Sequence, residues 1–123
     1  MDFDAIDGGR DNITTPEDMG ILLEYLFSHR NDDKYSGEMI SLLCSVQRRD
    51  MIPAGLPQEV KVAHKTGEIS GALLDAGIVF CGENPYVLCL MGRDVSDRNA
   101  GIKVFARISR DIYGEMQEES FRK

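Results

Sequence analysis

The spacing of the apolar residues changes from a helical period to a strand period near Val60 and back again after Asp97, which limits the folds open to this chain. Before Val60, apolar side chains recur every three to four positions and predict amphipathic helices over residues 16–29 and 36–48. Thr15 can cap the first of these helices. After Asp97 the helical spacing predicts a long final helix, with an inner face made by Ile102, Phe105, Ala106, Ile112, Tyr113 and Met116.

Three short runs between these helices have the pattern of β-strands, at residues 60–67, 75–82 and 86–93. The turn residues 83–85 separate the last two runs and keep Pro85 outside the ladder. Asp75 is expected to mark the start of its strand. The sequence therefore predicts an α+β fold, a three-stranded antiparallel sheet with flanking helices, in a single domain of residues 1–123.

The charge balance excludes two classes of partner. The formal net charge is −7 and the isoelectric point is near 4.7, so the chain repels phosphate backbones and anionic lipid heads. We therefore expect no nucleic-acid and no membrane partner, and the first residues have no pattern of an export signal. Two histidines and three cysteines without metal-ligand spacing predict no metal and no cofactor, with the thiols reduced and packed as small apolar groups.

The candidate site is the triplet Lys65-Thr66-Gly67 in the first predicted strand. Lys65 supplies a point charge for a carboxylate, Thr66 supplies a hydroxyl donor, and Gly67 removes the Cβ that would keep a ligand's backbone away. An exposed strand edge can also pair with an extended ligand. His64 should point to the opposite side of the strand from Lys65 and act as a packing or surface group.

The setting of this triplet resembles the C-terminal half of class A β-lactamases and their relatives among the penicillin-recognising serine hydrolases. The resemblance rests on "NITTPEDM", "IPAGLPQEVKVAHKTG", "DAGIVF" and "PYVLCLMGRD" in this order and spacing. It implies part of a β-lactamase/transpeptidase-like fold and a β-lactam or D-alanyl peptide-like ligand whose carboxylate lies against Lys65 and Thr66. It also implies that the backbone N–H of Glu68 is one of two donors to the acyl oxyanion.

The nucleophile of that family has no counterpart in this sequence. Its Ser-x-x-Lys motif occurs once, as Ser120 to Lys123, downstream of the triplet and at the end of the chain, and Ser-x-Asn does not occur. We therefore expect no catalytic residue here. Residues 1–12 resemble an internal stretch of the family, so we expect the latter half of a serine hydrolase that is inactive alone and that binds its missing N-terminal half or itself.

Two other functions remain open. The parent could be a DD-peptidase, because these enzymes use the same triplet. The chain could instead be a non-catalytic module that binds peptides or a partner along its strand edge.

Overall fold

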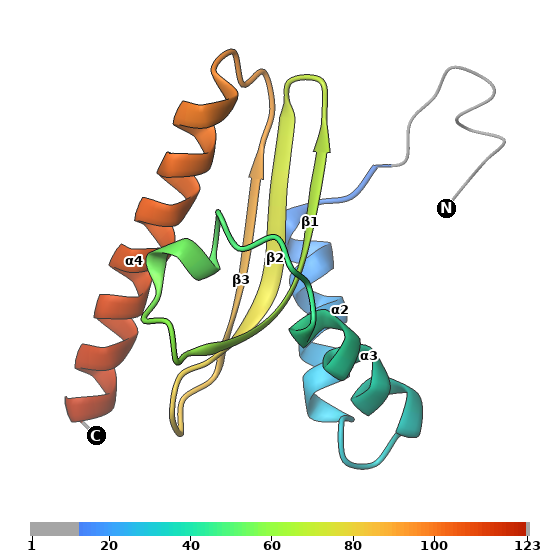
Figure 1. The fold of residues 1–123 in the computed structure, drawn as a ribbon. Helices are drawn as coiled ribbons and strands as arrows, with labels where there is room; N and C mark the ends of the chain where they lie inside the picture. Colours follow the sequence, from blue (N-terminus) through green and yellow to red (C-terminus); the bar gives the residue numbers. More distant parts are fainter. Residues whose placement is uncertain (1–12, 123) are drawn as a thin grey trace, which may run out of the picture.

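The computed structural model of the chain describes residues 13–122 (Figure 1). Two helices, α2 (Pro16–Ser28) and α3 (Lys34–Cys44), are followed by a short 3-10 turn, η1 (Pro53–Gly55). Three strands come next, β1 (Lys61–Ile69), β2 (Ala72–Phe80) and β3 (Tyr86–Gly92). The long helix α4 (Arg98–Arg122) ends the described chain. This order confirms the predicted α+β fold.

The strands form one antiparallel sheet in the order β1-β2-β3, with β2 in the centre. Lys65 pairs with Ala76, and Thr66 pairs with Asp75. The side chains of the first pair therefore point to one face of the sheet and those of the second pair to the other. Helices α2 and α3 cover one face and α4 covers the other (Figure 1). Within the described residues, β1 and β3 are the two edges of the sheet.

Each face of the sheet has its own apolar core. On the α2 and α3 side, the buried residues are Leu23, Leu26, Ile40, Ala63, Ala76 and Ile78. On the α4 side, the strands pack against η1 and α4 through two clusters, whose buried members are Met51, Ile52, Val62, Leu73, Val79, Cys81, Leu88, Ile102 and Phe105. The alternation of these residues along β1 and β2 is what places successive side chains of the triplet on opposite faces.

Several sequence-based boundaries were wrong. Strand β1 continues to Ile69, beyond residue 67, and strand β2 ends at Phe80 rather than at residue 82. Strand β2 begins at Ala72 rather than at Asp75, because Ser70 and Gly71 form a tight turn, in which Gly71 has a φ of 75° that favours glycine. Helix α3 begins at Lys34 and ends at Cys44, not at residues 36 and 48. Its start is set by Asp33, whose carboxylate accepts hydrogen bonds from the Tyr35 backbone N–H and the Ser36 hydroxyl.

The cysteines are free thiols, as the sequence indicates. Burial raises the pKa values of the Cys44 and Cys89 thiols, which keeps both groups in the unreactive neutral form. The expectation that residues 1–12 match an internal stretch of the family concerns residues outside the part that the structure describes.

Candidate functional site

The side chains of Lys65 and Thr66 leave strand β1 on opposite faces. Lys65 is exposed and lies on the face that α2 and α3 cover, with Ala63 and its cross-strand partner Ala76, whereas Thr66 lies on the α4 face with its cross-strand partner Asp75. The Lys65 ammonium curls back and donates a hydrogen bond to the Thr66 carbonyl oxygen, 2.6 Å away. The positive charge therefore lies beside the backbone of the triplet.

Gly67 lies on the same face as Lys65, and the Leu74 side chain of β2 packs closely against it. A Cβ at Gly67 would lie 2.9 Å from Cγ of Leu74, so a larger residue there would displace that side chain. Gly67 and Glu68 border a hollow of about 820 Å³, which extends to the segment before α2 and to the end of β3. The Gly67 end of the triplet thus adjoins open space large enough for a small ligand.

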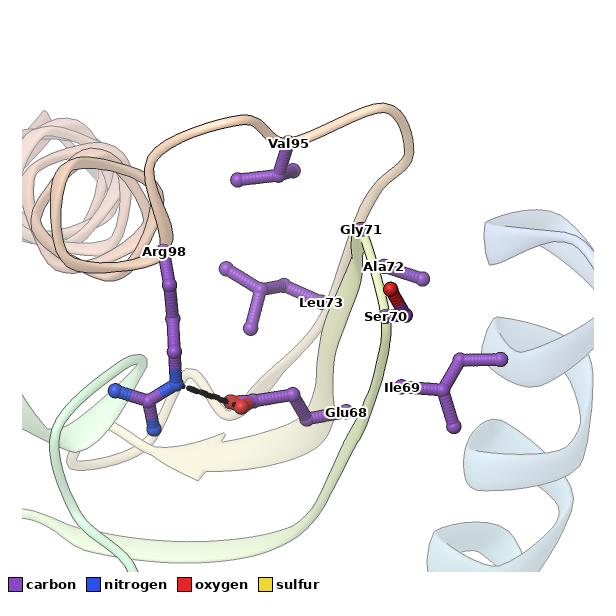
Figure 2. Close-up of a pocket in the computed structure, with 8 residues that line it drawn as sticks. All are labelled: Glu68, Ile69, Ser70, Gly71, Ala72, Leu73, Val95 and Arg98. Carbon is purple, nitrogen blue, oxygen red and sulfur yellow. Dashed lines mark hydrogen bonds and ion pairs between the residues drawn. The ribbon is translucent and has the colours of Figure 1, made fainter.

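The side chain of Glu68 turns toward α4, where two arginines bind it. Figure 2 shows the Arg98 side chain directed at the Glu68 carboxylate. Arg98 Nε lies 2.6 Å and 2.8 Å from the two carboxylate oxygens, and Arg48 lies 3.3 Å from one of them. The hydrogen bond from Arg98, more than that from Arg48, holds the pKa of the Glu68 carboxyl below its usual range. The negative charge of Glu68 is therefore paired, which reduces its repulsion of an anionic ligand at the neighbouring triplet.

A second hollow, which we call the apolar groove, lies on the α2 and α3 side of the sheet. It has a volume of about 310 Å³ and is lined by Leu22, Leu26, Met39, Leu42 and Leu74, with Lys65 as its charged residue. The apolar part of the Lys65 side chain lies along this groove while its ammonium reaches the strand backbone.

His64 and Asp75 form a buried pair that the sequence analysis missed. Both side chains are fully buried, and His64 Nδ1 lies 2.8 Å from a carboxylate oxygen of Asp75. The interpretation of Asp75 as the start of a strand was wrong, since it lies inside β2 and points into the α4 side of the sheet. His64 was predicted to point to the opposite side of the strand from Lys65. Its burial on the α4 side of the sheet is consistent with that prediction.

Ser120 lies far from the triplet in the fold. It is on α4 and accepts a hydrogen bond of 2.9 Å from Asn84, in the turn between β2 and β3. Lys65 is on the opposite face of the sheet. Among residues 13–122, no group of three or more His, Cys, Asp or Glu residues is arranged to hold a metal ion, and no helix is long and apolar enough to cross a membrane.

Comparison with known proteins shows the family of the chain. Residues 1–116 match the model of the Beta-lactamase enzyme family, so the chain belongs to that family. The structure of PBP-A is similar with a TM-score of 0.77 and 25% identity, over 85% of this chain and 40% of that one. A mutant of PBP-A, solved as an acyl-enzyme complex with penicillin G, matches at a TM-score of 0.76, also with 25% identity and the same coverage of both chains.

A protein of lower sequence identity has a similar fold. The β-lactamase of Sphaerobacter thermophilus has a TM-score of 0.77 at 21% identity, over 85% of this chain and 41% of that protein. No curated protein matches the sequence. The chain thus spans about two fifths of the length of the solved structures that it resembles.

Proposed function

We propose that this chain holds the carboxylate of a β-lactam or a D-alanyl peptide at the edge of β1 that is open in the described sheet, where Lys65, Thr66, Gly67 and Glu68 can be reached although the Lys65 and Thr66 side chains leave the strand on opposite faces. The observation that carries the proposal is the position of the Lys65 ammonium, which lies 2.6 Å from the Thr66 carbonyl on an edge strand. There the charge adjoins the backbone groups with which an extended ligand would pair. Membership of the Beta-lactamase enzyme family and the penicillin G complex of PBP-A support this class of ligand.

Acyl transfer at this site would need a nucleophile from outside these 123 residues. The single Ser-x-x-Lys of the sequence begins at Ser120, which lies against the turn after β2 and not beside the triplet. By itself the chain would therefore bind a β-lactam reversibly and would not be acylated. In the complete site, the Glu68 backbone N–H would serve as one donor to the oxyanion, while its side chain stays paired with Arg98.

Penicillin G and its methyl ester test the proposed site by comparison. We expect penicillin G to shift the amide NMR signals of residues 65–68 in ¹H–¹⁵N spectra and the ester to shift them far less, because the ester lacks the charge that Lys65 would bind. Equal shifts for both compounds would show that the carboxylate is not what the chain binds. A preference for peptides without any carboxylate would favour the alternative, a peptide-binding module.

We also infer that this chain associates, either with the remainder of such a fold or with a second copy of itself. Leu42, at the apolar groove, is 71% exposed, and Leu22 and Met39 beside it are each 49% exposed. Strand β3 adds an apolar edge within the described sheet. The molar mass of the isolated chain, measured by light scattering, should rise with concentration. A constant monomer mass would contradict self-association.

A further inference from the structure

A line of buried hydrogen bonds connects α4 to the strand that carries the triplet. The Ser109 hydroxyl on α4 donates to the Ile52 carbonyl oxygen at 2.8 Å, and the Ile52 N–H donates to one oxygen of Asp75 at 2.9 Å. The other oxygen of Asp75 binds Nδ1 of His64 at 2.8 Å. The side chains of Ser109, Asp75 and His64 are all fully buried. We call these four residues the buried line.

The hydrogen-bond partner of His64 in the buried line determines which of its ring nitrogens carries the proton. A carboxylate accepts hydrogen bonds, so Nδ1 of His64 carries the proton that it donates to Asp75. The other ring nitrogen, Nε2, is buried and has no partner within the described residues. The Asp75 carboxylate accepts one hydrogen bond from the Ile52 N–H and one from His64. These two bonds offset the free-energy cost of burying the carboxylate.

Two glycines give the buried line its space. Gly77 pairs with His64 across the sheet, and a Cβ there would lie 2.6 Å from Cβ of His64. At Gly55, a Cβ would overlap the Ala106 carbonyl oxygen and lie 2.7 Å from the Arg110 nitrogen. The chain after Ile52 therefore packs directly on α4, close to Ser109.

We propose that Asp75 and His64 are positioning residues for the carboxylate subsite at Lys65 and Thr66. Asp75 pairs directly with Thr66, and His64 precedes Lys65 in the same strand. Strand β1 has a ladder on one side only within the described sheet, so a side-chain anchor on its buried face limits how far the strand can twist. That twist sets the directions of the Lys65 and Thr66 side chains. The inference rests on the function proposed above.

The variant Asp75→Asn separates positioning from bulk stability. The asparagine keeps the shape of the side chain, and its oxygen can still accept from the Ile52 N–H, but its NH₂ group faces His64. His64 can then bond only by accepting at Nδ1, which moves its proton to Nε2. The matched control is Val79→Ala, a buried residue on the same strand and the same face that makes no bond in the line.

Ring ¹⁵N spectra give the first readout, since the chain has only two histidines. We expect His64 to carry its proton on Nδ1 in the parent chain and on Nε2 in Asp75→Asn, with no change in Val79→Ala. A parent ring with its proton on Nε2 would overturn the line of hydrogen bonds on which the inference rests.

Affinity for penicillin G, measured where each variant is fully folded, gives the second readout. Asp75→Asn removes a negative charge near Lys65, so electrostatics alone predicts tighter binding of an anion. Positioning predicts the opposite sign, a Kd raised about tenfold, or about 1.4 kcal/mol, while Val79→Ala stays within about twofold of the parent, or about 0.4 kcal/mol. Equal or tighter binding by Asp75→Asn would overturn the proposal.

If the parent chain does not bind penicillin G, the proposed function fails and the positioning role is judged by amide hydrogen exchange. Asp75→Asn should then speed exchange at residues 65–67 more than in the rest of β1, and Val79→Ala should not. The same exchange pattern in both variants would show that the line contributes only to overall stability.

Discussion

Replacing Gly77 with alanine should lower the free energy of unfolding by about 3 kcal/mol, because the centre of the sheet has no room for a methyl group. The added Cβ would lie 2.6 Å from both the Ala63 carbonyl oxygen and Cβ of His64. One of these contacts is with the backbone of β1, so a side-chain rotation cannot relieve it. Strands β1 and β2 would have to separate where His64 meets Asp75.

Gly20→Ala is the matched control and should have the opposite sign. Gly20 lies inside α2, and a Cβ there would meet nothing within 4 Å apart from its chain neighbours and the nearby backbone of its own helix. Alanine in a helix interior is favoured over glycine, so this change should stabilise the chain by about 0.5–1 kcal/mol. Urea denaturation of the three proteins measures both effects. A Gly77→Ala variant as stable as the parent would mean that β1 and β2 are not packed as closely as described here.

Lys65→Ala should raise the Kd for penicillin G about tenfold or more. A charge-assisted hydrogen bond to a carboxylate contributes about 1.5–3 kcal/mol, and about 1.4 kcal/mol corresponds to a factor of ten in affinity. The ammonium lies beside the Thr66 carbonyl in the free chain and would exchange that bond for one to the ligand. Calorimetric titration with penicillin G measures the difference.

Lys61→Ala controls for the loss of one positive charge. Lys61 lies on the same strand and the same face as Lys65, but its ammonium lies 5.4 Å from the Phe80 ring centroid, near the other end of β1. Its removal should change the Kd by less than about twofold, or about 0.4 kcal/mol. If both variants lose affinity equally, the ligand responds to net charge and the triplet is ordinary strand surface.

The periodicity of the sequence was enough to predict the sheet and the main helices. Apolar residues every three to four positions marked α2 and α4, and the turn residues 83–85 separated β2 from β3. The residue types of the triplet, together with their setting, were enough to predict the family. These features depend on residues close together in the chain, and they can therefore be predicted from the sequence alone.

The partners of the site residues depended on register and tertiary packing. Asp75 was interpreted as the start of a strand because the turn at Ser70 and Gly71 was not recognised in the sequence. With that turn in place, the antiparallel register sets Asp75 opposite Thr66 and within reach of His64, eleven residues away in sequence. Arg98 is 30 residues from Glu68 and meets it only because α4 packs on that face of the sheet.

The most direct test of the account is the intact mass of the chain after incubation with penicillin G under conditions in which the complex forms. The proposed ligand-holding groups lie on β1, and no nucleophile is proposed among these 123 residues. We therefore expect the protein, denatured and weighed, to have the mass of the unmodified chain. A stoichiometric penicilloyl adduct on any serine, Ser120 included, would contradict it.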